Sequence, residues 1–205
     1  LPGGAALNLP DQPFALPFAY YAQHLEQSGV QAMIDDLLAD HAAAPLAPSE
    51  LERRLFEIRW SIFRAPMSQA TRDQVVGLLS ARWPATTRVR FRSSTNVEDL
   101  AEFTGAGLYT SASAALQDGP EAVENAIKTV WASVWNAQAF VERDFYRVDH
   151  ANVRMAVLVH PSADDEAANG VALTINEFAE RRPAFYINSQ ILDVSVTNPT
   201  GDAVP

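Results

Sequence analysis

The sequence contains no cysteine among its 205 residues. This excludes disulfide bridges, thiolate zinc sites and cysteine nucleophiles. Basic residues are also scarce, since 15 lysines and arginines face 25 aspartates and glutamates, and the formal net charge is −10. An acidic chain of this kind argues against binding to nucleic acid or to anionic membranes, because both require a basic surface. No apolar run approaches the roughly 20 residues that a membrane-spanning helix needs.

Several common motifs are missing as well. The chain has neither a P-loop (GxxxxGK[ST]) nor a complete GxGxxG, and no GxSxG nucleophile elbow is present. Residues 1–7 lack the basic segment and apolar core of a secretory signal, which favours a cytoplasmic protein. The chain begins without methionine and residues 202–205 suggest no terminal element. We therefore expect it to be a piece of a longer protein.

What is present is ordinary globular composition, with 48% apolar and 20% charged residues. Apolar residues recur at helical spacing through most of residues 1–84, whereas residues 85–205 mix strand-like and helical patterns. The sequence therefore predicts an α+β (mixed α/β) fold with a mostly helical subdomain at 1–84 and an α/β subdomain at 85–205. The sheet is expected to be mainly antiparallel, with a helical insert.

Local signals place the elements within these two parts. A short strand is expected near residues 14–18, and the following helical pattern is interrupted near Gly29. Ser49 and Glu52 have the spacing of a capping box at the start of the next helix. The default expectation for the tryptophans is helix packing in the core, and for the histidines a structural or exposed position without metal. These residues are Trp60, Trp83, Trp131, Trp135, His24, His41, His150 and His160.

The most informative stretch lies around Arg92. Arg88, Arg90 and Arg92 alternate and so project from one face of a predicted strand, which delivers the chain into a polar loop from Ser93 to Asp99. A row of arginines is ordinarily an exposed edge strand blunted by charge. The hydroxyl and amide side chains at residues 93–96 instead suggest an anion site, since they complement a guanidinium on phosphate oxygens. The pattern is compatible with polyphosphate binding without being specific for it.

Specificity comes from resemblance to a known family. Residues 92–100 read RSSTNVEDL and residues 105–109 read GAGLY. Together they are similar to the signature of the ATP-binding domain in the phosphoenolpyruvate synthase/pyruvate phosphate dikinase family. The likeness continues in order along nearly the whole chain, through FALPFAYY, AIKTVWASVWN, MAVLVHP and ANGVALT.

This resemblance implies the N-terminal lobe of an ATP-grasp-like domain. In the family, ATP lies between two lobes and its phosphoryl group passes to a histidine on a separate domain of the same protein, and then to an acceptor. Arg92 is then the catalytic candidate, because it would hold the ATP phosphates and offset the charge that builds up during transfer. The implied cofactors are ATP and Mg²⁺, with the metal ligands outside this chain. The nucleotide-binding candidates are Arg92, Ser93, Ser94, Gly105, Gly107 and Tyr109.

The sequence also departs from the family pattern. Residues 2–8 contain no lysine, Gln138 stands where the family helix has an arginine, and a GLGE loop is absent near residues 191–195. Glu98 and Asp99 are expected to fix the loop rather than bind metal. Whether the chain is an enzyme by itself is therefore open. The rival hypotheses are a non-catalytic ATP- or anion-binding module for regulation or assembly, and a structural interaction domain.

Overall fold

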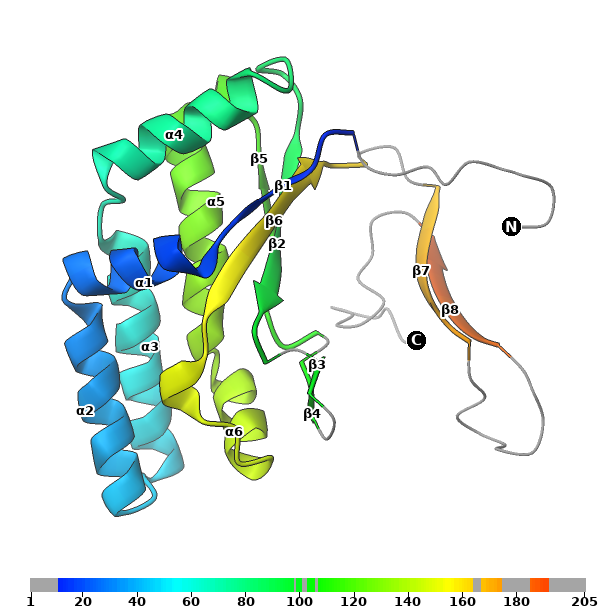
Figure 1. The fold of residues 1–205 in the computed structure, drawn as a ribbon. Helices are drawn as coiled ribbons and strands as arrows, with labels where there is room; N and C mark the ends of the chain where they lie inside the picture. The colour runs from blue at the N-terminus through cyan, green and yellow to red at the C-terminus, as the bar shows by residue number, and fades with distance from the viewer. Residues whose placement is uncertain are drawn as a thin grey trace. The chain divides into compact units, whose positions relative to one another are not determined.

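The computed structural model describes residues 11–97, 99–100, 103–105, 107–163, 167–174 and 185–191 (Figure 1). The chain divides into two compact units between Ser162 and Ala163. The predicted subdivision between residues 84 and 85 falls inside the first unit and stays a prediction. The mixed α/β fold with an antiparallel sheet is confirmed.

Four helices form the first part of the larger unit: α1 (Phe18–Gln27), α2 (Val30–Ala43), α3 (Pro48–Arg64) and α4 (Gln69–Ser80). Gly29 separates the first two with a φ of 73°, in the left-handed region that glycine adopts without strain. The capping box at Ser49 was a wrong prediction, because α3 begins one residue earlier at Pro48, with Ala47 as its N-cap. Proline suits the first helical turn, since its fixed φ is already helical.

The sheet of this unit has the strand order β1-β6-β2-β5 and is antiparallel throughout. β6 (Met155–Pro161) lies between β1 (Phe14–Leu16) and β2 (Val89–Thr95), and β5 (Ala112–Ala114) flanks β2 on the other side. The longest pairing joins all seven residues of β2 to β6, from Val89 opposite Pro161 to Thr95 opposite Met155.

The helices lie on one side of this sheet (Figure 1). α1 contacts β6, and α5 (Pro120–Ala132) contacts β2, β5 and β6. The side chains that face these helices are buried, among them Leu16, Val89, Phe91, Val157 and Val159. Because neighbouring residues of a strand point to opposite faces, the alternate residues of β2 and β6 lie on the face that these helices do not cover.

The expected helical insert is divided into three pieces. α5 ends at Ala132, a 3₁₀ turn covers Ser133–Trp135, and α6 spans Ala137–Phe145. In the turn before α5, Gly119 has a φ of 96°, and Pro120 occupies the first helical turn. A further 3₁₀ turn, His150–Asn152, leads into β6.

Two small antiparallel hairpins complete the described structure. β3 (Asp99–Leu100) pairs with β4 (Phe103–Thr104) just after β2. In the second unit β7 (Ala168–Leu173) pairs with β8 (Tyr186–Ile191). An added Cβ at Gly170 would lie 2.7 Å from the Asn188 carbonyl oxygen, so this position requires glycine. Within the described ranges, no helix is long and apolar enough to cross a membrane.

The core prediction for the tryptophans is confirmed at three positions and wrong at one. Trp83, Trp131 and Trp135 are buried in the single core that joins the helices to the sheet. Trp60 is 50% exposed on α3. Trp60 lies about half a turn from the buried stripe of α3, on a second apolar stripe with Phe56 and Phe63, and helical spacing alone does not say which of two stripes faces the core.

Candidate functional site

Arg90, Arg92 and Ser94 lie on the uncovered face of the sheet, where β2 pairs with β6. The backbone pairs them with His160, Leu158 and Ala156, which therefore share that face. The loop predicted to begin at Ser93 was wrong, because β2 continues to Thr95 through this pairing. The extension turns Ser93 toward the helix side, with Phe91, so that Ser94 is the serine beside Arg92 on the open face.

The two arginines differ in how they are held. The Arg90 guanidinium donates from Nη1 to the Ser113 hydroxyl at 3.2 Å, and that hydroxyl lies 3.4 Å from the Ser162 hydroxyl. Arg92 is exposed and forms no hydrogen bond or ion pair with any residue in the described ranges. One guanidinium is thus anchored, and the other presents all its N–H donors to solvent.

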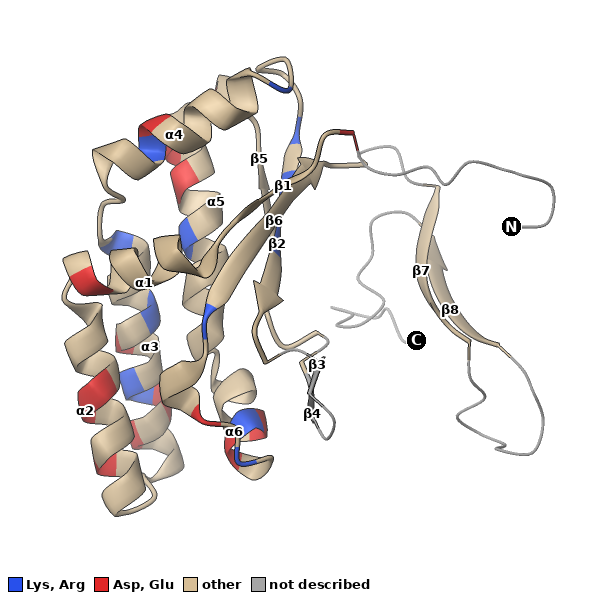
Figure 2. Cartoon of the chain, viewed as in Figure 1, with Lys and Arg blue, Asp and Glu red and all other residues tan. Residues whose placement is uncertain are grey.

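Within the described residues, the charges on the strands of this face are positive, although the chain as a whole is acidic. The four strands of the sheet carry Arg90 and Arg92 and no aspartate or glutamate, whereas the helices carry charges of both signs (Figure 2). Guanidinium groups bind phosphate and carboxylate through two parallel hydrogen bonds, and serine hydroxyls supply further donors. This face can therefore bind an anion.

The turn that contains Gly105 and Gly107 is held by its own backbone contact and by residues at the start of α6 and within it. The Leu108 N–H donates to the Gly105 carbonyl at 3.1 Å, and Gly107 has a φ of 80°. The Asn136 amide donates to the Leu108 carbonyl at 3.3 Å. Tyr109 is buried, with its hydroxyl engaged by α6, so its side chain does not join Arg92 on the open face.

The group that engages Tyr109 is a buried cation. Arg143 of α6 is 0% exposed, and its Nη1 donates to the Tyr109 hydroxyl at 3.3 Å. Its Nε donates to Nδ1 of His150 at 3.3 Å, and its guanidinium lies 5.9 Å from the centre of the Trp135 ring. No carboxylate of the described residues forms an ion pair with Arg143. The neutral partners leave its charge uncompensated, which makes this network costly to form and sensitive to change.

His150 is the titratable member of this network. Its ring stacks on Phe140 with centroids 4.0 Å apart, and burial, followed by the nearby Arg143 charge, lowers the pKa of His150 to about 4. Asp144 acts in the opposite direction, since its carboxylate lies 3.8 Å from Nε2 of His150. The ring is therefore neutral at physiological pH and accepts the hydrogen bond from Arg143.

Acidification is expected to destabilise the fold through this histidine. Because the pKa of His150 is lower in the folded state, neutral His150 makes its full contribution to the unfolding free energy above the unfolded pKa of about 6.5. This contribution is lost as the pH falls towards about 4. The shift corresponds to roughly 3 kcal/mol across that window. We expect His150→Gln to lose less unfolding free energy than the wild type between about pH 7 and about pH 4. Urea unfolding at each pH measures this.

The matched control is His160→Gln, which removes a histidine from the open sheet face. His24, whose pKa burial also lowers, is present in both variants and cancels in the comparison. Equal pH dependence in the wild type and the His150 variant would contradict the assignment of the acid sensitivity to His150.

Sequence reasoning placed Arg90 and Arg92 correctly on one face of a strand, whereas Arg88, expected in the same row, lies one residue before β2. It did not find the Arg143 network or the Ser113–Ser162 support of Arg90. One signal was available, because Arg143 is four residues after the buried Ala139 and three after the buried Phe140, on the buried stripe of α6. In the part of the chain that the structure describes, no three or more acidic or histidine side chains group as a metal site. Glu98 lies outside the described residues.

Comparison with known proteins shows the family of the chain. Residues 4–192 match the family described as pyruvate phosphate dikinase, AMP/ATP-binding domain, and the chain belongs to this family. The phosphoenolpyruvate synthase of Aeropyrum pernix is 30% identical over 186 residues, which are 86% of this chain and 22% of that protein. The phosphoenolpyruvate synthase of Pyrococcus furiosus is 33% identical over 101 residues, covering 49% of this chain and 12% of that protein.

A probable phosphoenolpyruvate synthase of Methanothermobacter thermautotrophicus is 27% identical over 173 residues, 80% of this chain and 24% of that protein. The chain thus spans about a quarter or less of the curated relatives it matches. The resemblance on which the sequence analysis relied is confirmed.

Proposed function

We propose that the chain forms one wall of the ATP site of a phosphotransferase of the phosphoenolpyruvate synthase/pyruvate phosphate dikinase type. The observation that carries the proposal is the open, electropositive sheet face, on which exposed Arg92 stands without a described partner beside Ser94 and Arg90. Membership of an AMP/ATP-binding domain family supports a nucleotide phosphate as the anion. The wall belongs to an ATP-grasp-like lobe of a cytoplasmic protein, and a second lobe supplies the opposite wall.

Each residue of the face has a separate task in this proposal. Arg92 grips phosphate oxygens through two N–H donors and offsets charge that builds up on the transferred group. Arg90 adds a second positive charge. Because Ser113 already holds its side chain, nucleotide binding need not order that side chain. Ser94 donates its hydroxyl on the same face, and Ser93 shapes the strand beside it. Bound ATP supplies the activated phosphoryl group.

The remaining predicted residues, Gly105, Gly107 and Tyr109, belong to a turn that we propose contacts the phosphates. Gly105 and Gly107 allow the turn to come close to a phosphate, and Tyr109 fixes the turn through its contact with Arg143. The Mg²⁺ ligands lie outside this chain. The phosphoryl acceptor is a histidine on another domain of the same longer protein.

A non-catalytic ATP- or anion-binding module is the second candidate. One observation favours it: Gln138 is exposed on α6 and offers no positive charge where the resemblance places an arginine. Such a module would keep the Arg92 face for regulation or assembly, without turnover.

Titration of the ¹⁵N-labelled 205-residue chain with MgATP tests the proposed wall. We expect the amide signals of β2 and of residues 107–109 to shift, with a Kd of about 1 mM or weaker because one wall supplies only part of the contacts. Inorganic triphosphate should shift the β2 signals in the same way, since the phosphates carry the interaction.

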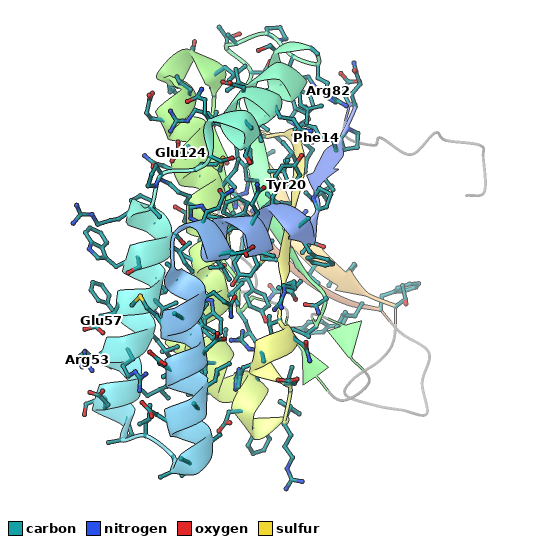
Figure 3. All side chains as sticks on the ribbon, turned by 60° about the vertical axis from the view of Figure 1, so that its left-hand side comes forward. Phe14, Tyr20, Arg53, Glu57, Arg82 and Glu124 are labelled. Carbon is teal, nitrogen blue, oxygen red and sulfur yellow. The ribbon has the colours of Figure 1, made fainter. Side chains whose placement is uncertain are left out.

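Two outcomes would contradict the proposal. Unchanged β2 signals at about 20 mM MgATP would contradict the assignment of the site, because any weaker binding would be non-specific. A submicromolar Kd for the chain alone would contradict the idea of a single wall. Arg53→Ala is the control, since it removes an arginine from the outer surface of α3 (Figure 3).

A further inference from the structure

A groove opens along the exposed side of α3. It has a volume of about 320 Å³ and lies between α3 and the junction of α5 with the 3₁₀ turn at 133–135. Three aromatic side chains of α3, Phe56, Trp60 and Phe63, line one wall. Their rings stack in sequence, with 6.4 Å between the Phe56 and Trp60 centroids and 6.4 Å between those of Trp60 and Phe63. Ligand pockets are concave, mainly apolar and about 300 Å³ or larger, so the groove has the size of a site for a small molecule.

One cation lies among these rings. Arg59 is the single charged side chain of the groove lining, and it forms no ion pair with a described residue. Its Nη1 donates to the Trp135 carbonyl at 3.0 Å, which orients the guanidinium. Burial lowers the pKa of Arg59, and the Glu52 charge opposes this effect. The groove therefore holds a positioned, partly desolvated positive charge whose remaining N–H donors can bind an anion.

The other polar side chains of the lining are neutral. The Thr129 and Ser133 hydroxyls donate to backbone carbonyls of α5, at 2.8 and 2.7 Å. The Asn136 amide donates to the Leu108 carbonyl at 3.3 Å. A negative group in the groove would therefore be compensated by Arg59 alone.

We propose that this groove binds a small aromatic carboxylate. The flat ring of the ligand packs against Phe56, Trp60 and Phe63, and its carboxylate accepts two parallel hydrogen bonds from the Arg59 guanidinium. One guanidinium compensates the single charge of a carboxylate. A phosphate dianion would need a second cation, which the lining does not contain.

The groove also adjoins the turn that contains Gly105 and Gly107. Thr110 of the lining follows this turn directly, and Asn136 of the lining holds the Leu108 carbonyl. A bound ligand should therefore change the surroundings of residues 108–110. No residue of β2 lines the groove, so this site and the proposed nucleotide wall are separate, and either proposal can fail without the other.

Titration of the ¹⁵N-labelled 205-residue chain with 2-naphthoate tests the site. We expect the amide signals of Thr110 and Asn136 and the indole signal of Trp60 to shift, with a Kd of about 0.1 mM, while the β2 signals stay in place. The carboxamide of the same ring system keeps the shape and lacks the charge, so it should bind about ten-fold more weakly. Calorimetry on the intact longer protein should give the same Kd for 2-naphthoate.

Three variants separate the charge from the rings. Arg59→Gln should weaken 2-naphthoate about ten-fold and leave the carboxamide within about two-fold, whereas Trp60→Ala should weaken both ligands. Arg54→Gln is the matched control, because this arginine of the same helix is paired with Asp40, and it should leave both Kd values unchanged. Far-ultraviolet circular dichroism checks that each variant is folded.

Three results would overturn the proposal. The first is the absence of shifts around the groove at about 5 mM 2-naphthoate. The second is equal affinity for the carboxylate and the carboxamide, which would leave Arg59 without a role. The third is binding to the 205-residue chain that is lost in the intact protein, because another part of that protein would then cover the groove.

Discussion

Replacing Arg92 with alanine in the intact protein is expected to reduce ATP-dependent phosphoryl transfer by about 100-fold to 1,000-fold. Phosphoryl transfer depends mainly on positioning and on electrostatic stabilisation of the transferred group. Arg92 is an exposed guanidinium without a described partner on the open face, so its donors are available to phosphate. The measurement is kcat and KM for ATP in steady-state turnover.

Two further variants show why the activity falls. Arg92→Lys keeps the charge but loses the planar pair of donors, so we expect an intermediate decrease. Arg53→Ala removes the same charge from the opposite layer and should leave kcat within about two-fold, as expected for an exposed surface residue. A wild-type rate in the Arg92→Ala protein would refute the assignment of this residue.

Replacing Glu124 with alanine is expected to lower the free energy of unfolding by about 3 to 5 kcal/mol. Glu124 of α5 is 5% exposed, and its Oε1 accepts from the Met67 N–H at 2.9 Å and from the Lys128 ammonium at 2.9 Å. Its Oε2 forms an ion pair with Arg72 of α4 at 2.5 Å. Alanine would leave the buried Lys128 without a counter-charge and the Met67 amide without an acceptor. Figure 3 labels Glu124 on α5, close to α4.

The controls separate charge from packing. Glu26→Ala, at an exposed position of α1, should change the unfolding free energy by at most about 0.5 kcal/mol. The second comparison is between the single variant Glu124→Leu and the double variant Glu124→Leu with Lys128→Met. The double variant removes both buried charges and should recover a large part of the unfolding free energy that the single variant loses. If urea unfolding finds the single and the double variant equally destabilised, the effect arises from packing and not from charge.

The same carboxylate has a pH signature. Burial raises the pKa of Glu124, but the Met67 N–H, Lys128 and Arg72 together lower it by more than burial raises it. The pKa of Glu124 therefore lies below its ordinary value. Its contribution is therefore present above the ordinary glutamate pKa of about 4.3 and is lost as the pH falls below it. Glu124→Gln should remove this part of the acid sensitivity.

The arginine face was predictable from the sequence because strand alternation is a local property. The side-chain period of two places Arg90 and Arg92 on one face whatever else β2 touches. The end of β2 was not predictable in the same way, since Ser93 and Ser94 have the composition of a loop. Their conformation is set by backbone pairing with β6, more than 60 residues later in the chain. Local propensity gives way where a distant ladder partner is available.

Burial was the other source of error. Trp60 and Trp131 both fall on apolar helical stripes, yet Trp131 is 1% exposed and Trp60 is 50% exposed. Which stripe faces the core depends on how α3 and α5 pack against each other, and the sequence of one helix does not contain that information. Arg143 is the reverse case, because its charge suggests the surface, whereas it is 0% exposed and contacts Tyr109, Trp135 and His150.

The position of β6 between β1 and β2 also affects how the protein folds during synthesis. Phe14 must wait for Val159, its opposite residue in the sheet, and β2 must wait for the same strand. On the ribosome the helices therefore emerge and form well before the sheet that they cover. The side of α1 that contacts β6 remains without this partner until the last strand of the unit arrives, an interval in which a chaperone has a surface to bind. Completion of the sheet is then the step that creates the arginine face.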